Sequence, residues 1–222
     1  MRPLVVAVAL FCVLCTMPGH GRGADWPESQ DRLADLIPSG HPCRKYFQIV
    51  FAATYRKFGE PIPLLFINQF FQESRCDSSA TSKVGAAGIG QIMPKTQRDL
   101  EKKLGHEVDI RDAADNIDLA LTLDYQYRKL WKPEARSYCD RLWLMLGGYN
   151  GGPGYWINAQ KVCTEKTGGT CNGFTDMAPF YPDVNASGAK ENLGYPTIIS
   201  THWAKMQPTG GCDPVLATKY LR

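Results

Sequence analysis

Apolar residues recur at helical spacing along much of this 222-residue chain, most clearly over residues 63–74. Pro63 suits the first turn of a helix, where its missing N–H leaves no intrahelical bond unmade. Glu73 shares one side of the predicted helix with side chains that lie three, four and seven positions earlier. The pattern therefore predicts a helix with a single carboxylate at the end of a partly aromatic strip. The apolar positions of this stretch are Leu64, Phe66, Ile67, Phe70 and Phe71.

The same spacing predicts a mostly helical chain. Helices are expected over residues 44–58, 94–106, 112–131 and 138–147, with a short one opening at Tyr155 and a last one beginning at Pro196. Residues 25–42 and 163–188 look irregular because prolines interrupt them, and the tail from Pro208 is expected to be an extended strap. We find no internal repeat and no sign of a second domain.

Two stretches rich in small residues follow predicted helices. The side chains of residues 76–90 are mostly small, which lets a ligand approach the backbone closely or simply makes a flexible surface loop. Residues 147–154 contain five glycines in eight positions and predict an unusual backbone path. A hairpin between helices would explain that path without any function. A phosphate-binding loop is not supported, because no Lys-Ser or Lys-Thr pair follows at the required spacing.

The first residues have the pattern of an export signal. Arg2 supplies a positive charge, residues 4–15 form an apolar run, and small, turn-forming residues follow. The run is too short for a membrane span, so we predict a signal peptide over residues 1–23, with an uncleaved N-terminal anchor as the alternative. We expect an exported protein of the periplasm or cell envelope, a monomer in which residues 24–222 form a single domain.

Composition argues against two classes of partner. Without Arg2 and Arg22 the chain has 23 basic and 22 acidic residues, so its charge gives no support for binding nucleic acid. The cysteines form no close CxxC pair and the histidines are scattered, which argues against a zinc site. We therefore expect no metal and no cofactor.

The cysteines instead indicate disulfides. Cys12 and Cys15 lie in the predicted signal peptide, which leaves an even number in an exported chain. Six cysteines allow 15 pairings, and sequence alone does not choose among them. The short, hairpin-like loop between Cys163 and Cys171 favours a bond between these two. The six candidates are Cys43, Cys76, Cys139, Cys163, Cys171 and Cys212.

Four segments, in order, resemble the motifs of the soluble lytic transglycosylase family. They are Glu73-Ser74-Arg75, the segment from Gly85 to Pro94, the run Gly147-Gly148-Tyr149-Asn150-Gly151-Gly152, and the segment from Glu191 to Pro196, which lacks one residue before the proline. Each is weak alone because glycine-rich turns are common, but four in family order over roughly residues 44–206 are specific. Gly90 departs from the pattern, since many relatives carry a larger apolar residue there.

The resemblance implies a mostly α, lysozyme-like α+β fold, in which a disulfide-stabilised helical domain carries a small β-sheet and loop along one side of a glycan cleft. It implies that Glu73 is catalytic and that Tyr149 lies over the cleft with its hydroxyl within reach of Glu73. Met93 has core packing as an equal alternative. The substrate-binding residues that the resemblance implies are Ser74, Gln91, Met93, Tyr149, Asn150 and Tyr195.

The chemistry implied is cleavage of peptidoglycan at the MurNAc-β-1,4-GlcNAc bond with a 1,6-anhydromuramoyl product. Burial among apolar groups raises the pKa of a carboxyl group, so Glu73 would serve as the single general acid and base. A lysozyme-type hydrolase, a non-catalytic glycan-binding protein, and a merely solvated glutamate at a helix end are the alternatives. The system that the protein serves stays open among cell-wall turnover, a phage, and secretion or conjugation machinery.

Overall fold

The computed structural model describes residues 26–60, 62–131, 135–207 and 212, and these are mostly α-helical. This confirms the mostly α fold class. The predicted signal peptide and, apart from Cys212, the predicted strap lie outside the described residues. The elements are α1 (Trp26–Asp35), η1 (Arg44–Tyr46), α2 (Phe47–Phe58), α3 (Pro63–Ser74), α4 (Pro94–Leu104), α5 (Ala113–Leu130), α6 (Tyr138–Gly151), α7 (Pro153–Thr167), α8 (Phe174–Met177), η3 (Ala178–Phe180), α9 (Tyr181–Val184) and α10 (Ala189–Met206).

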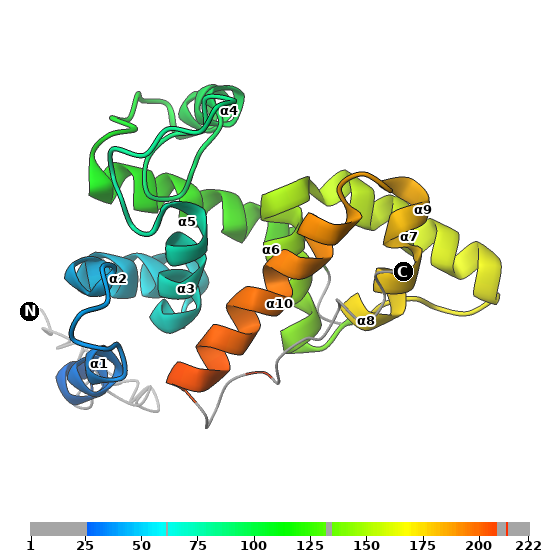
Figure 1. Ribbon diagram of the computed structural model, residues 1–222, viewed down its shortest axis with the longest axis horizontal. Coiled ribbons are helices and arrows are strands. Elements are labelled where there is room, and N and C mark those ends of the chain that lie inside the picture. Colours follow the sequence, from blue (N-terminus) through cyan, green and yellow to red (C-terminus); the bar gives the residue numbers. More distant parts are fainter. Residues whose placement is uncertain (1–25, 61, 132–134, 208–211, 213–222) are drawn as a thin grey trace, which may run out of the picture.

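The helices α3, α5, α6 and α10 form the centre of the molecule. Helix α5 packs on α6 and α2, and α10 packs on both α3 and α6. Figure 1 shows α4 and the loop before it on one side of this centre and α7 to α9 on the other. Because residues 64–70 of α3 are all buried, this helix is a rod surrounded by the others. The end of α3 thus lies where the two sides of the molecule meet.

Local sequence explains several helix ends. Helix α3 begins at Pro63, as predicted. Helix α5 begins after Asp112, whose side chain accepts hydrogen bonds from the backbone N–H groups of Ala114 and Asp115. Helix α2 stops at Gly59, which has a φ of 73° that glycine adopts without strain.

Three segments are more helical than the sequence analysis expected. Residues 25–42 include α1, in which Pro27 belongs to the first turn, and residues 163–188 include the end of α7, α8, η3 and α9. Prolines 179 and 182 also lie in first turns, so they mark helix starts rather than loops. The glycine run is helical as far as Gly151, and only Gly152 turns away, with a φ of 87°.

The expected β-sheet is reduced to isolated bridges. Among the described residues, Thr81 pairs with Ala87 and Ala87 pairs with Ile92, both antiparallel. The loop of residues 76–93 is otherwise irregular and is held by turns and by contacts with helices. The β part of the predicted α+β fold is therefore a loop with two bridges.

All six candidate cysteines form disulfides. The pairs are Cys43–Cys76, Cys139–Cys212 and Cys163–Cys171, and the last of these confirms the predicted pairing. Each bond includes one cysteine that lies in a helix or directly follows one, because Cys76 follows α3, Cys139 lies in α6 and Cys163 lies in α7.

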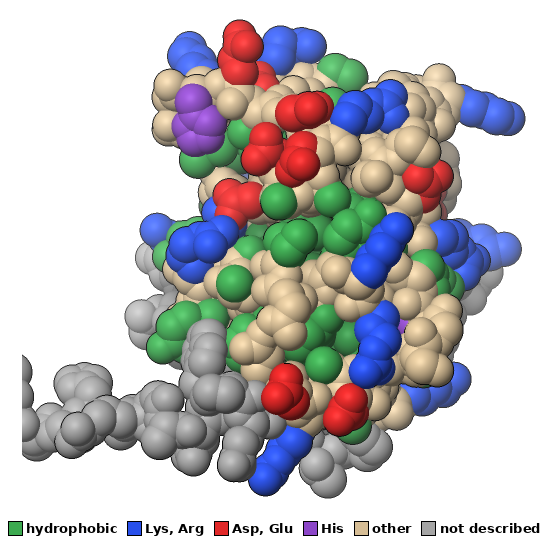
Figure 2. All heavy atoms as spheres, turned by 90° about the vertical axis from the view of Figure 1, so that its left-hand side faces the viewer, with side chains coloured by type: hydrophobic (Ala, Val, Ile, Leu, Met, Phe, Trp, Pro, Cys, Tyr) green, Lys and Arg blue, Asp and Glu red, His purple; other side chains and the backbone are tan. Residues whose placement is uncertain are grey.

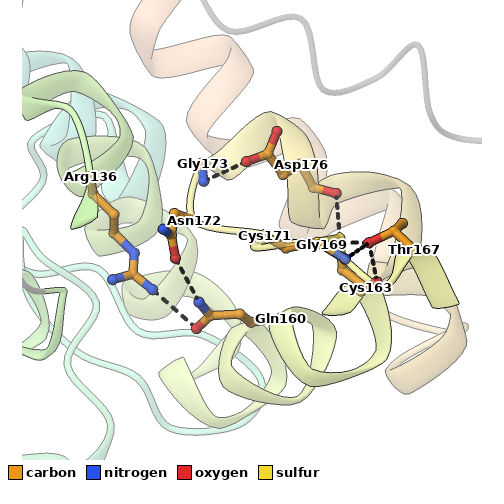
Figure 3. Close-up of a disulfide and its surroundings, with 9 residues drawn as sticks. All are labelled: Arg136, Gln160, Cys163, Thr167, Gly169, Cys171, Asn172, Gly173 and Asp176. Carbon is orange, nitrogen blue, oxygen red and sulfur yellow. Dashed lines mark hydrogen bonds between the residues drawn. A yellow bond between two sulfur atoms is a disulfide. The ribbon is translucent and has the colours of Figure 1, made fainter. Parts of the chain in front are cut away.

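The Cys163–Cys171 bond closes the turn after α7 (Figure 3). The hydroxyl of Thr167 donates to the Cys163 carbonyl at 2.8 Å and accepts from the Gly169 N–H at 3.2 Å. Beyond the bond, Gln160 of α7 donates to Asn172 at 3.3 Å. These contacts fold the chain back from α7 to α8 far from Glu73, so we assign this disulfide to stability.

None of the helices described here is long and apolar enough to cross a bilayer. On the face in Figure 2, acidic and basic side chains are interspersed with small apolar patches. The formal net charge of the whole chain is +3. This face therefore carries no broad field of one sign.

Candidate active site

Glu73 lies in the last turn of α3, where the chain turns away sharply. Arg75 and Cys76 both have positive φ, of 58° and 60°, which is uncommon for residues with side chains. The Arg75 and Cys76 N–H groups bond back to the carbonyls of Phe71 and Phe70. The disulfide from Cys76 to Cys43 then holds the turn. The end of α3, and with it the Glu73 side chain, is thereby held in place.

The Glu73 carboxyl is hydrogen bonded by a tyrosine of α10. The hydroxyl of Tyr195 donates to Glu73 Oε1, and Tyr195 is buried. Burial raises the pKa of Glu73 to about 7, with the nearby Glu191 adding to the rise and the Tyr195 hydrogen bond opposing it. At neutral pH, Glu73 can therefore either give or take a proton.

A groove of about 590 Å³ opens beside Glu73. Its lining comes from the end of α3, the end of α6, and one side of α10 and the turn before it. Three of the expected site residues, Glu73, Asn150 and Tyr195, belong to it. The lining residues are Gln72, Glu73, Asn150, Ser187, Lys190, Glu191, Gly194, Tyr195 and Ile198.

Apart from Tyr195, the α10 side of the groove was not expected, because this helix was predicted to begin at Pro196. The helix begins seven residues earlier, at Ala189, and contains Pro196 in its interior. An interior proline usually breaks or kinks a helix, which is why the sequence favoured a start there. From this start, the positions that line the groove recur at helical spacing and would have been recognised as one stripe. They are 190, 191, 194, 195 and 198 of α10, preceded by 187 in the turn before the helix.

Tyr149 does not make the contact expected of it. Its hydroxyl donates to the Gly90 carbonyl at 2.6 Å, so the tyrosine bound to Glu73 is Tyr195 instead. The two side chains are still near each other, because the charge of Glu73 adds to the rise that burial causes in the pKa of Tyr149. A Cβ at Gly90 would lie 2.9 Å from the Tyr149 hydroxyl and 2.7 Å from Ala120 Cβ. The departure at Gly90 therefore has a structural reason, since no larger side chain fits beside Tyr149.

The loop opposite α10 is tied to three helices. Ser74 of α3 donates to the Ile89 carbonyl at 2.8 Å. Asn116 of α5 accepts from the Gly90 N–H at 2.7 Å and donates to the carbonyls of Ala87 and Ile110 at 3.1 and 3.0 Å. Ser74, expected to bind substrate, thus holds the loop, and the buried Asn116 of α5 supports the same loop.

Gln91 and Met93 lie on the same loop but outside the groove lining. The Gln91 amide nitrogen donates to the carbonyls of Gly88 at 2.9 Å and Ala80 at 3.4 Å, so it is used within the loop. Met93 is 40% exposed at the start of α4, which excludes the core-packing alternative. A role for either in binding sugar stays a prediction.

Asn150 lies where α6 meets α10. Its amide nitrogen donates to Asn192 Oδ1 at 2.8 Å, and Asn192 donates in turn to the Gly188 carbonyl at 2.8 Å. A Cβ at Gly151 would lie 2.0 Å from Asn192 Oδ1, so the glycine permits this close approach. Part of the glycine run thus serves to join two helices at the groove.

Other carboxyl groups near Glu73 differ from it in setting. Asp77 is exposed and accepts hydrogen bonds from the Ser79 N–H and hydroxyl, at 2.8 and 2.7 Å. Asp124 is fully buried, and Glu191 lines the groove. No group of three or more histidine, cysteine or acidic residues suited to a metal occurs among the described residues.

Comparison with known proteins finds relatives of one kind, and three of the matches are described here. A family model for the transglycosylase SLT domain matches residues 48–168. The membrane-bound lytic murein transglycosylase F of Maricaulis maris is 28% identical over 131 residues, which are 57% of this chain and 26% of that protein. An inactive mutant of the lytic transglycosylase Slt of Pseudomonas aeruginosa is similar in structure, with a TM-score of 0.51 and 20% identity over 77% of this chain and 25% of that chain. This chain therefore spans about a quarter of the length of each protein, and the structural likeness bears on the fold alone.

Proposed function

Because the chain belongs to the transglycosylase SLT domain family, we propose that it is a peptidoglycan lytic transglycosylase with Glu73 as its only acid and base. The observation that carries the proposal is the state of Glu73. Its pKa is raised to about 7 at the edge of an open groove, where a neutral carboxyl can meet a glycan. The names of the similar proteins support peptidoglycan as the substrate class.

The reaction begins with the protonated carboxyl of Glu73. Its proton goes to the glycosidic oxygen between MurNAc and GlcNAc as the bond from C1 to that oxygen breaks. The positive charge that develops at C1 is stabilised by the oxygen of the substrate's own N-acetyl group, so the protein needs no second carboxylate at this step. Tyr195 then holds the ionised Glu73 through its hydroxyl, which is the form that this hydrogen bond favours.

The second step restores Glu73. Its carboxylate takes the proton from the 6-hydroxyl of the same muramoyl residue while O6 bonds to C1, which gives the 1,6-anhydro product. No water is consumed, and Glu73 ends protonated as it began. Because donor and acceptor belong to one sugar, the step is unimolecular, which is a large advantage in effective concentration. The helix stripe on α10 and the loop that Asn116 ties would orient the strand.

A hydrolase is the second candidate, and one observation favours it. Hydrolytic glycosidases commonly use two carboxyl groups, and Glu191 lines the same groove as Glu73. In that reading Glu191 would activate a water. Glu191 lies on the exposed side of α10, and the partner that bonds the Glu73 carboxyl is Tyr195, which makes the transglycosylase the better-supported function.

The products of digested sacculi distinguish the two. Purified protein is incubated with sacculi, and the soluble muropeptides are analysed by mass spectrometry. We expect products lighter by one water than those of hydrolysis, and none from Glu73→Gln. Glu165→Gln, on the exposed side of α7, is the matched control and should release the same products as the wild type. Products that carry the added water would identify a hydrolase, and a folded wild type that releases nothing would leave a glycan-binding protein.

The remaining expectations extend the proposal. We propose export through the signal peptide of residues 1–23, a single catalytic domain from residue 24, action in the periplasm or cell envelope, and a monomeric state. Opening a local gap in the wall for secretion or conjugation machinery is one use that fits such an enzyme. Mass determination of the N-terminus of the purified, expressed protein tests the cleavage.

A further inference from the structure

A fully buried polar pair joins α5 to α3 behind the groove. Asp124 and Gln69 both have 0% exposure. The Gln69 amide nitrogen donates to Asp124 Oδ2 at 2.9 Å. The remaining polar atom of each side chain, Gln69 Oε1 and Asp124 Oδ1, is buried without a hydrogen-bond partner. Two acceptors are therefore left unmatched in a single contact between two side chains.

If Asp124 were ionised, both of these oxygens would remain without a hydrogen-bond donor. A carboxylate has only acceptors, and the oxygen of an amide is also an acceptor, so both would keep an uncompensated lone pair in the interior. Buried polar groups without partners are costly, and a buried unpaired charge is more so. A single proton on Oδ1 changes this atom from an acceptor into a donor and gives Gln69 Oε1 the partner that it lacks.

We propose that Asp124 is held as a neutral carboxylic acid that donates from Oδ1 to Gln69 Oε1. With the bond from Gln69 to Oδ2, this closes a cyclic pair with two hydrogen bonds. Gln69 lies one turn before Glu73 on the same side of α3. On the proposed function, the pair makes Asp124 a positioning residue: it fixes α3 against α5 and keeps a second negative charge away from the catalytic carboxyl.

The surroundings of Asp124 support the neutral form. Burial raises the pKa of Asp124 well above its usual value, the hydrogen bond from Gln69 opposes the rise, and the charge of Glu73 adds to it. α2 and α4 direct Lys57 and Lys103 elsewhere, to Asp118 and Gln126 of α5. The titratable groups that interact with Asp124 are Glu73 of α3, Tyr127 of α5, Tyr149 of α6 and Tyr195 of α10.

The first test observes the proton directly in the wild-type protein. Carboxyl carbons of aspartate are labelled with ¹³C, Asp124 is assigned through the backbone, and its shift is followed from pH 4 to pH 8. We expect a shift typical of the acid at pH 6, whereas Asp77, whose pKa is lowered by the hydrogen bonds from Ser79, should give the shift of a carboxylate. A shift typical of the carboxylate at pH 6 would overturn the proposal. The result does not depend on any enzymatic activity, so it stands apart from the proposed function.

The second test uses Asp124→Asn, which keeps the shape and both hydrogen bonds, since its amide can donate to Gln69 Oε1. In the wild type, unfolding releases the Asp124 proton at any pH between the unfolded pKa, about 3.9, and the higher folded pKa. Stability in the wild type should therefore fall relative to Asp124→Asn as pH rises, by about tenfold in the unfolding equilibrium constant per pH unit. An unfolding equilibrium in which the two proteins keep a constant ratio from pH 5 to pH 7 would contradict the proposal.

Asp118→Asn is the matched control on the same helix. Burial opposes ionisation of Asp118, but the hydrogen bonds from Lys57 and Arg56 hold its pKa below the usual value. Its stabilisation is thus fully present above the unfolded pKa of about 3.9 and is lost only as pH falls below that value, so the unfolding equilibrium constants of this variant and the wild type should keep a constant ratio from pH 5 to pH 7.

The positioning role has its own readout in the pH profile of cleavage. Asp124→Asn replaces one neutral group by another. The high-pH limb, which is the fall in cleavage rate as Glu73 becomes ionised, should therefore stay at the same pH. Gln69→Glu would put a net negative charge into the pair and should move that limb to higher pH. A downward shift of the limb in Asp124→Asn would show that Asp124 had been ionised and would overturn the role.

Discussion

Glu73 at the end of α3 and Asp124 in the middle of α5 are two carboxyl groups whose pKa is raised mainly by burial. Glu73 meets the groove and is held by a hydroxyl, which can stabilise the charged form. Asp124 is sealed in the interior and is held by an amide. Burial thus prepares both groups to keep a proton near neutrality, but only access to the groove lets one of them transfer it.

The two settings also differ in what a neutral substitute does. An amide can replace a carboxylic acid that only makes hydrogen bonds, but it cannot replace one that must lose its proton to a leaving group. Asparagine or glutamine substitution therefore separates a proton donor from a structural acid, although burial raises the pKa of both groups. The predictions below use this difference.

The largest expected effect is on the rate of cleavage by Glu73→Gln. Losing a general acid should lower the rate roughly 10²- to 10⁴-fold, while Asp124→Asn should lose far less. Release of soluble muropeptides from labelled sacculi measures both. Equal losses in the two variants would remove the distinction between the open and the sealed carboxyl.

Relative to the wild type, the same Glu73→Gln variant should become more stable as pH rises. The folded pKa of about 7 lies above the unfolded value of 4.5, so the native protein loses stability between those two pH values as the unfolded chain releases its proton. Because glutamine has no proton to release, the variant avoids this loss, and its free energy of unfolding should exceed that of the wild type by at most about 3 kcal/mol above pH 7. Urea unfolding at pH 5 and pH 8 tests it, and a gain that is larger at pH 5 would contradict the raised pKa.

The next effect concerns the sealed pair. Gln69→Leu would leave the Asp124 acid without a partner and should lower the free energy of unfolding by about 1–3 kcal/mol. Replacing both residues by leucine removes the polar groups together and should recover most of that loss. Urea unfolding at pH 6 compares the single and double variants. A double variant that is as unstable as the single one would show that packing, rather than the unmatched acid, explains the loss.

The smallest effects are opposite shifts of the pKa of Glu73. Tyr195→Phe removes the hydrogen bond that lowers this pKa, so the high-pH limb of cleavage should move up by roughly one pH unit. Glu191→Gln removes a charge that raises it, so the limb should move down by less. Initial rates between pH 5 and pH 9 resolve the two. Shifts in the same direction would mean that Glu73 does not govern the limb.

Helix periodicity predicted the helices that carry the site's centre but not all of its lining. Helices α3 and α5 begin and end close to their expected bounds, because a proline start and an aspartate cap are local signals. The start of α10 was wrong, because Pro196 is tolerated inside a helix packed on α3 and α6. Three lining residues before Pro196, namely Ser187, Lys190 and Gly194, were missed for that reason.

Helix α3 and the Cys163–Cys171 pairing could be read from the order of residues, because each depends on neighbours within a few positions. The family could be read because its short motifs occur in a fixed order along the chain. The partner of Glu73 could not. Tyr149 and Tyr195 both stood in matching motifs, and which hydroxyl reaches the carboxyl depends on how α6 and α10 pack against α3. The pairing of Gln69 with Asp124 is of the same kind, since 55 positions separate them. Contacts of this range are decided by the packing of whole helices, which no local pattern encodes.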